Sequence, residues 1–270
     1  MLDDTIEFQL ILEAIYLKYG YDFRNYSKAS IKRRIIHKLE MSRLPNLSAL
    51  QHKIIHNYEF FKELLFDITI HVTEMFRDPS FYHTLRENVI PILKTYPHIN
   101  IWHAGCSSGE EVYSMAILLK EEGLLDKSQL YATDINESVL NKAKEGIYPL
   151  DKIKEYTMNY QKSGGLESFA GYYTARYNAA IMNKSLKKHI VFSQHNLVTD
   201  GVFAEMNLIF CRNVLIYFNK HLQNRVIGLF HDSLVRKGFI GLGSKESIKF
   251  TDYHTHFKTI NEKERLYQKV

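Results

Sequence analysis

The sequence predicts an α/β protein in which a doubly wound parallel sheet follows an all-helical amino-terminal domain and carries a small inserted subdomain. Residues 1 to about 75 place apolar side chains at steps of three and four residues, which is typical of amphipathic helices. From about residue 98, short apolar runs alternate with helix-like segments, as in a parallel sheet covered on both faces. We therefore place a helical domain at residues 1–78 and the α/β domain at residues 79–270, with the insertion at about 150–190.

Two apolar stripes predict the helices of the first domain. Their members are Phe8, Ile11, Leu12, Ile15 and Tyr19 in the first stripe and Ile31, Ile35 and Leu39 in the second. Basic residues, including Lys32, Arg33 and Arg34, surround the second stripe. Such a helix either contacts an acidic partner or presents an ordinary solvated face.

The order of segments predicts the α/β domain. Strands are expected at residues 99–104, 130–133, 206–210 and 238–243, and helices at residues 110–122, 139–144 and 222–236. The insertion is rich in tyrosine and contains Gly164-Gly165. We interpret it as an excursion from the regular strand–helix alternation.

The composition excludes several classes of protein. No apolar run approaches the roughly 20 residues that span a bilayer, so no membrane insertion is expected. The amino terminus lacks the basic and apolar regions of a secretory signal, and we expect the cytoplasm. Cys106 and Cys211 are interpreted as small buried thiols, because two cysteines without neighbouring ligands do not make a metal site. The net charge of +5 permits either nucleic acid or an acidic protein as partner.

A glycine-containing loop follows the first predicted strand. Gly105 and Gly109 enclose Cys106-Ser107-Ser108, and a helix begins at Glu110. Glycines let the chain turn sharply and let a ligand approach the backbone, and ligands of doubly wound sheets bind at the carboxyl ends of the strands. The pair also fits a tight turn without any ligand, and it departs from the G-x-G-x-x-G dinucleotide pattern.

Acidic residues near this loop indicate the kind of ligand. Asp134 ends the second predicted strand, where a carboxylate can accept both hydroxyls of a ribose or can instead cap the following helix. Glu110 and Glu111 directly follow the loop. They would repel a pyrophosphate but not a sulfonium and an ammonium, which favours S-adenosylmethionine over a dinucleotide. The same two glutamates would also complement the dipole of their own helix.

Four stretches, in this order, resemble the CheR family of chemoreceptor glutamate methyltransferases. They are IHVTEMFRDP at residues 70–79, IWHAGCSSGEEVYS at 101–114, ATDIN at 132–136 with GIY at 146–148, and IFCRNVLIYF at 209–218. The similarity covers nearly the whole chain. It implies a helical domain, a Rossmann-like methyltransferase domain and a small inserted β-subdomain.

The resemblance also implies the cofactor and the site. The cofactor would be S-adenosylmethionine, and Arg77 and Tyr217 would flank the transferred methyl group. The cofactor-binding residues implied by the family's motifs are His71, Thr73, Arg77, Gly105, Glu111, Asp134, Asn196, Leu197, Arg212 and Asn213. No metal is implied.

Three departures from the family pattern stand out. His71 replaces an asparagine, and Gly243-Ser244-Lys245-Glu246 replaces a common Gly-His-Ser-Glu. The insertion lacks the glycine-rich hairpin with which some members hold a receptor's carboxyl-terminal peptide.

The expected reaction is methyl transfer to glutamate carboxylates of a chemoreceptor or a related Glu-rich helical protein, and the expected contact is the helix around Lys32, Arg33 and Arg34. A carboxylate is ionised at pH 7, so no strong base is required. Two alternatives stay open, namely an S-adenosylmethionine enzyme acting on RNA and a non-catalytic cofactor-binding module. No recognisable RNA-binding motif is present, which argues against nucleic acid as partner. The presence of Arg77 and Tyr217 weighs against the second alternative.

Overall fold

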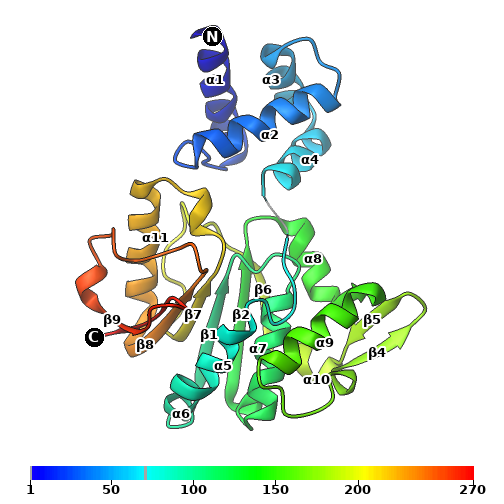
Figure 1. Ribbon diagram of the computed structural model, residues 1–270. Helices are drawn as coiled ribbons and strands as arrows, with labels where there is room; N and C mark the ends of the chain where they lie inside the picture. The colour runs from blue at the N-terminus through cyan, green and yellow to red at the C-terminus, as the bar shows by residue number, and fades with distance from the viewer. Residues whose placement is uncertain (1, 70–71) are drawn as a thin grey trace. The chain divides into compact units, whose positions relative to one another are not determined.

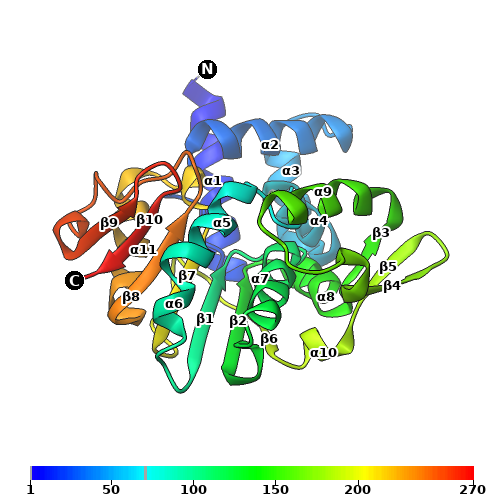
Figure 2. The same ribbon diagram turned by 60° about the horizontal axis from the view of Figure 1, so that its bottom comes forward.

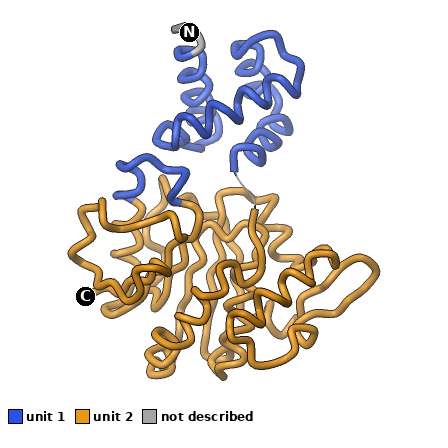
Figure 3. Tube along the Cα trace, viewed as in Figure 1, with its two compact units in different colours: residues 1–70, 215–225 blue, residues 71–214, 226–270 orange. Residues whose placement is uncertain are grey.

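A computed structural model describes residues 2–69 and 72–270, and the chain divides into two compact units. The helical unit consists of residues 1–70 and 215–225, and the α/β unit consists of residues 71–214 and 226–270 (Figure 3). Among the described helices, none is both long enough and apolar enough to cross a bilayer.

The helical unit is built from four helices around a shared core. They are α1 (Leu2–Tyr19), α2 (Lys28–Met41), α3 (Leu47–His56) and α4 (Tyr58–Ile68). Both predicted apolar stripes supply that core, with Ile11, Ile15 and Ile35 fully buried. Asparagine side chains start α3 and α4, since Asn46 accepts from Ala49 N at 2.9 Å and Asn57 from Phe60 N at 3.0 Å.

A segment distant in sequence completes the helical unit. It comprises η4 (Leu215–Tyr217) and the first residues of α11 (Lys220–Ser233). Ser27 N donates to the carbonyl of Tyr217 at 2.7 Å, and Asn219 N donates to the carbonyl of Asn25 at 3.0 Å. The rings of Tyr26 and Phe218 meet edge to face, 4.9 Å between centroids. The sequence analysis did not predict this association.

The α/β unit contains a seven-stranded sheet (Figure 1). Its spatial order is β6 (Ile190–Gln194), β2 (Ser128–Asp134), β1 (Ile99–Ala104), β7 (Met206–Cys211), β8 (Leu234–Leu242), β10 (Leu266–Lys269) and β9 (Phe257–Asn261). The first five strands are parallel, and β10 is antiparallel to both of its neighbours. The chain winds from β1 through β2 to β6 and then returns to β7 on the other side of β1. The doubly wound sheet is thereby confirmed, and its switch point, where such sheets bind ligands, lies between β1 and β7.

Helices in this unit pack along the sheet, as Figures 1 and 2 show. They are α5 (Pro79–Asn88), α6 (Ile90–Leu93), α7 (Glu110–Glu121) and α8 (Glu137–Glu145), together with the carboxyl-terminal part of α11. Two short 3-10 helices, η1 (Leu125–Lys127) and η5 (His254–His256), precede β2 and β9. The unit division lies between residues 70 and 71, not after residue 78 as the sequence analysis placed it. The reason is packing, because Met75 and Phe76 are fully buried in the core of the α/β unit.

The inserted subdomain lies between β2 and β6. It follows α8 and contains a three-stranded antiparallel sheet and several short helices, and the hairpin of β4 (Tyr173–Arg176) and β5 (Ala179–Met182) lies apart from the seven-stranded sheet in both ribbon views (Figures 1 and 2). Its remaining elements are β3 (Ile147–Pro149), η2 (Leu150–Lys152), α9 (Ile153–Lys162), η3 (Phe169–Tyr172) and α10 (Lys184–Lys187). The middle strand of the small sheet is β5.

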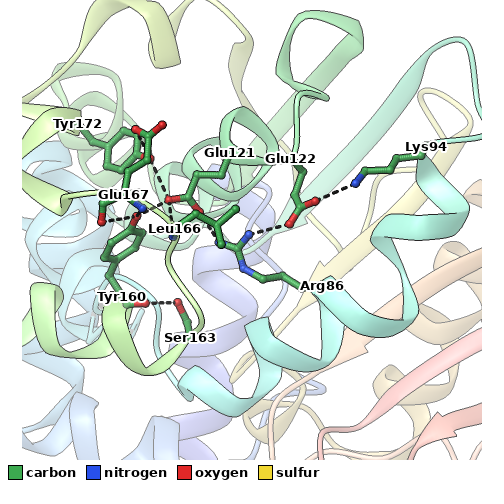
Figure 4. A network of polar contacts seen from close by, with 9 residues as sticks. All are labelled: Arg86, Lys94, Glu121, Glu122, Tyr160, Ser163, Leu166, Glu167 and Tyr172. Carbon is green, nitrogen blue, oxygen red and sulfur yellow. Dashed lines mark hydrogen bonds and ion pairs between the residues drawn. The ribbon is translucent and has the colours of Figure 1, made fainter.

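A buried carboxylate connects this insertion to the helices of the core (Figure 4). The side chain of Glu121, at the end of α7, is 0% exposed. It accepts from Arg86 and Tyr160, from the hydroxyl of Tyr172 at 2.9 Å and from Leu166 N at 3.1 Å. Burial, and then the hydrogen bond to this carboxylate, raise the pKa of Tyr160 to about 12. Four donors therefore compensate the desolvation of one carboxylate.

Candidate active site

The loop between β1 and α7 depends on both of its glycines. Gly105 has a φ of +81° and Gly109 a φ of +93°. A Cβ on Gly105 would lie 2.5 Å from the side chain of Val214, and a Cβ on Gly109 would lie 2.9 Å from that of Ala143. Gly105 N and Cys106 N both donate to the carbonyl of Thr133, at 2.8 and 2.9 Å, which holds the loop against the end of β2. The tight turn is thus explained by local packing, and it lies at the carboxyl ends of β1 and β2.

Asp134 lies at the end of β2 and binds the same loop. Its Oδ2 accepts from Ser107 N at 2.9 Å, and its Oδ1 accepts from Asn136 N at 3.0 Å. The cap of α8 is Asn136, whose side chain accepts from Ser138 N at 2.9 Å, so Asp134 is not the helix cap. Burial raises the pKa of Asp134, while these backbone N–H groups oppose the rise. The N–H of Ile135 is a third backbone donor to this carboxylate, which has about four acceptor positions, so room for about one further donor is left.

The two glutamates that begin α7 have different environments. Glu110 is buried, receives the hydroxyl of Ser108 at 2.8 Å, and has its pKa raised by burial to about 7. Glu111 has the opposite shift, because a hydrogen bond from His103 and the charge of Arg212 outweigh its burial and lower its pKa. The two acids therefore do not contribute equal negative charge near the loop, as the sequence had suggested. At pH 7 Glu111 is the ionised one, whereas Glu110 is partly protonated.

Arg212, at the end of β7, is a buried ion-pairing residue. Its side chain is 3% exposed, with Nη2 2.6 Å from Asp78 Oδ2 and Nη1 3.5 Å from Glu111 Oε2. The guanidinium also lies 4.2 Å from the ring centroid of Phe81 and donates to the carbonyl of Arg77 at 3.2 Å. Arg212 therefore holds the segment before α5 against the sheet. A direct contact between Arg212 and the cofactor stays a prediction.

Arg77 lies in that strained segment. Its neighbours Phe76 and Asp78 have φ values of 53° and 55°, which non-glycine residues rarely adopt. Arg77 Nη1 donates to the carbonyl of Val72 at 3.1 Å, while Asp78 pairs with Arg212. Asp78 therefore pairs with Arg212 and not with its neighbour Arg77. The Arg77 side chain is half-buried, and the carbonyl of Val72 restrains its guanidinium.

Two further predicted pairs lie at strand ends. After β6, the side chain of Asn196 accepts from Val198 N at 3.0 Å, and Leu197 is buried. The preceding residue, His195, donates its N–H to the carbonyl of Asp134 at 3.2 Å. After β7, Asn213 has a φ of 64° and donates its N–H to Glu246 at 2.9 Å.

The α/β unit thus brings together most of the predicted cofactor residues around the ends of β1, β2 and β7. Hydrogen bonds or ion pairs tie Asp134 to the glycine loop, and Arg212 to Glu111 and Arg77. Thr73 is half-buried in the segment before α5, and His71 lies outside the described residues. Tyr217 groups with the helical unit, where its carbonyl accepts from Ser27.

Sequence reasoning missed three residues of this site. Asp78 pairs with Arg212, His103 bonds to Glu111, and Glu246 accepts from both Asn213 N and Gly243 N, the latter at 2.6 Å. The available signals were the histidine inside the apolar run 99–104 and the places of Asp78 and Glu246 in family motifs. Their pairing with Arg212 and Asn213 depends on contacts across more than 30 positions of sequence.

Comparison with known proteins adds the family. The family model described as "CheR methyltransferase, SAM binding domain" matches residues 71–266, and the model described as "CheR methyltransferase, all-alpha domain" matches residues 6–69. The chain is 54% identical over 264 residues to a protein of Pseudomonas putida named "Putative methyltransferase Cher3", covering 98% of this chain and 97% of that protein.

Two further relatives are named "Chemotaxis protein methyltransferase". The protein of Borreliella burgdorferi is 30% identical, covering 90% of this chain and 88% of its own length, and that of Listeria innocua is 31% identical, covering 85% of each. The two family models follow the order of the two units, and the cofactor-binding match contains the β1, β2 and β7 ends described above. The chain therefore belongs to the CheR methyltransferase family and is an S-adenosylmethionine-dependent methyltransferase.

Proposed function

We propose that this chain transfers the methyl group of S-adenosylmethionine to glutamate side chains of a chemoreceptor or a related Glu-rich helical protein, forming methyl esters in the cytoplasm. The observation that carries the proposal is the likeness to "Chemotaxis protein methyltransferase" relatives over 85–90% of the chain. The likeness covers 90% and 85% of this chain, so it extends beyond the residues 71–266 that match the cofactor-binding family model.

The residues at the strand ends suit this cofactor. When bound, S-adenosylmethionine supplies an electrophilic methyl on a positive sulfur, beside an ammonium group and a ribose. Glu111 is ionised and 17% of its side chain is exposed, so it can receive the ammonium. Asp134 receives three backbone N–H groups and keeps about one acceptor position for a ribose hydroxyl. A pyrophosphate would instead meet the charge of Glu111.

Methyl transfer to a carboxylate requires the protein to align the carboxylate with the methyl group. A glutamate carboxylate, with an ordinary pKa near 4.3, is already a nucleophile at pH 7. One of its oxygens bonds to the methyl carbon as the carbon–sulfur bond breaks, and the electron pair of that bond stays on sulfur. Positioning two reactants in this way can supply roughly 7–11 kcal/mol.

Arg77 and Tyr217 are the residues proposed to flank the methyl group. The planar guanidinium of Arg77 would hold the substrate carboxylate, and its restraint by the carbonyl of Val72 reduces the freedom lost on doing so. The hydroxyl of Tyr217 would shape the path of the methyl group. Its segment is fastened by the hydrogen bonds to Ser27 and Asn25.

The basic surface of α2 is the proposed contact for the acidic partner. A groove of about 680 Å³ along this helix is lined by Ala29, Lys32, Arg33, Arg34, Ile36, His37 and Glu40. Arg34 is already engaged, because its Nη1 donates to the carbonyl of Asp67 at 2.6 Å. Arg33 and His37 are exposed, and Lys32 is half-buried. The contact is therefore proposed for Lys32, Arg33 and His37 more than for Arg34.

A methyl-transfer assay with tritiated S-adenosylmethionine tests the proposal. Incubation with a Glu-rich receptor fragment should yield radioactivity that alkali releases as methanol, because carboxyl methyl esters hydrolyse in base. Label that resists alkali and appears in added RNA would instead support an RNA methyltransferase. Cofactor binding without turnover on any Glu-rich fragment would support a non-catalytic binding module. Arg77→Ala should abolish the ester signal while the fold persists.

A further inference from the structure

His103 is a buried histidine in direct contact with the glutamate that we assign to the cofactor. It lies on β1, two residues before Gly105, and its side chain is 0% exposed. Its Nδ1 is 2.9 Å from Oε1 of Glu111. Its ring stacks on Phe210 of β7, with centroids 4.7 Å apart and an interplanar angle of 14°. The imidazole of β1 is thereby fixed against β7 by stacking, and its Nδ1 faces the first turn of α7.

The contacts define which nitrogen carries the proton. Glu111 is ionised and can only accept, so Nδ1 of His103 must donate. The other nitrogen, Nε2, is buried and has no hydrogen-bond partner within the described parts of the chain. The hydrogen bond to Glu111 therefore places a proton on Nδ1.

The two oxygens of Glu111 therefore differ in the hydrogen-bond donors that they receive. Oε1 receives His103 at 2.9 Å, whereas Oε2 has Arg212 Nη1 at 3.5 Å, beyond a good hydrogen bond. Arg212 makes its short contact with Asp78, at 2.6 Å. Oε2 is therefore the oxygen left with acceptor capacity.

We propose that His103 is a positioning residue that keeps the Glu111 carboxylate from closing further on Arg212 and presents Oε2 to the ammonium group of the cofactor. This inference rests on the proposed cofactor role of Glu111. Without the donor on Oε1, the nearest remaining cation is Arg212, and the carboxylate is expected to turn further towards it and shorten the present 3.5 Å ion pair. Closing that pair would remove the acceptor that the cofactor needs.

The opposing explanation is that His103 is a core residue that only packs against Phe210. The two explanations differ in what a substitution must preserve. Packing requires volume, whereas positioning requires a donor at the place of Nδ1. The amide nitrogen of asparagine can occupy that place, the amide nitrogen of glutamine reaches nearer to Nε2, and leucine fills the volume with no donor.

Calorimetry with S-adenosylhomocysteine on the full chain separates the explanations. The variants are His103→Asn, His103→Gln, His103→Leu, Glu111→Gln and the double variant with His103→Leu and Glu111→Gln. Hydrogen bonds to charged groups contribute about 1.5–3 kcal/mol, which corresponds to a loss of affinity of about tenfold to a hundredfold. We expect that loss for the leucine and glutamine replacements of His103 and a change within about threefold for asparagine. In turnover assays, the KM for S-adenosylmethionine should rise more than kcat falls.

The outcomes distinguish failure of this inference from failure of the cofactor assignment. If Glu111→Gln leaves affinity unchanged, the proposed role of Glu111 is wrong. If Glu111→Gln weakens binding but His103→Leu does not, only the positioning role is wrong. A double variant no weaker than Glu111→Gln alone supports coupling, and additive losses overturn it. Should the leucine variant not fold, asparagine and glutamine decide, since equal losses for both would refute a donor at Nδ1.

Discussion

The two ends of helix α7 carry carboxylates that differ in how completely their oxygens are paired. Glu121, at the carboxyl end, is fully buried and receives four donors from Arg86, Tyr160, Tyr172 and Leu166 (Figure 4). Glu111, at the amino end, is 17% exposed, with one short hydrogen bond and one long contact. The saturated carboxylate joins parts of the fold, and the incompletely paired one has room for a ligand. Pairing, more than residue type, therefore distinguishes the structural Glu121 from Glu111, the acid that we propose for the cofactor.

The largest expected effect is a loss of stability at Glu121, the fully paired carboxylate at the end of α7. Glu121→Ala should lower the free energy of unfolding by about 3–5 kcal/mol, because Arg86 would keep only Glu122 and the hydroxyls of Tyr160 and Tyr172 would lose the buried acceptor that they share. Its neighbour Glu122 is a matched control, since it is 16% exposed and pairs with both Arg86 and Lys94. Glu122→Ala should cost about 1 kcal/mol.

Urea unfolding followed by circular dichroism measures both variants, with S-adenosylhomocysteine affinity measured beside it. The comparison predicts a large loss of stability at Glu121 with little change in affinity. Equal losses of stability for Glu121→Ala and Glu122→Ala would show that saturation of the Glu121 carboxylate is not what stabilises this junction.

The second prediction concerns how stability depends on pH through Glu110 and Glu111, the two acids in the first turn of α7. The pKa of Glu110 is about 7 in the folded chain and 4.5 as its ordinary value, so the folded state favours the protonated form. Stability should therefore fall as pH rises from about 4.5 to about 7, by up to about 3 kcal/mol. Glu110→Gln should remove this loss and raise the melting temperature at pH 8, with little gain at pH 4.

Glu111→Gln is the opposite case, because the pKa of Glu111 is lowered. Its ionised form contributes stability that is present above the ordinary pKa and lost as pH falls, so the glutamine variant should be the less stable one at pH 7. Melting curves from pH 4 to pH 8 check both signs. Two variants with the same pH profile would show that the neighbouring acids do not differ as described.

A third effect concerns affinity at the end of β2. Asp134→Asn keeps the size of the side chain but replaces one acceptor oxygen with an amide nitrogen, which cannot accept from a backbone N–H. We expect affinity for S-adenosylhomocysteine to fall by about tenfold or more, as hydrogen bonds to a charged group contribute about 1.5–3 kcal/mol. Calorimetry measures the change, with Asn136→Asp, which retains a helix cap, as control. Unchanged affinity for Asp134→Asn would remove Asp134 from the cofactor site.

The sequence predicted what local patterns determine and missed what distant contacts determine. Apolar spacing located α1, α2, α7 and the central strands within a few residues, because burial of one face repeats with the period of the element. The grouping of residues 215–225 with the helical unit depends on hydrogen bonds to Asn25 and Ser27, which leave no periodic signal.

The candidate site shows the same limit. Its residues were found through motifs, yet nothing in the adjacent letters of Glu110 and Glu111 indicates which acid is ionised. That difference arises from His103 and Arg212, which approach only Glu111, and from the burial of Glu110. Similarly, Asp134 and Asn136 are both residues that cap helices, and the structure alone assigns the cap to Asn136.

The smallest expected effect concerns two neighbouring arginines of α2, one hydrogen-bonded and one exposed. Arg34 donates to the carbonyl of Asp67, while Arg33 is exposed. Arg33→Glu should raise the KM for a Glu-rich helical peptide by about two- to fivefold at low salt, since single exposed charges contribute about 0.2–1 kcal/mol each. Lys154→Glu, an exposed position on α9 with the same change of charge, is the control. The difference between the two variants should shrink as ionic strength rises to about 0.3 M, where screening shortens the range of the interaction. Equal effects of the two substitutions would mean that net charge, and not this surface of α2, attracts the partner.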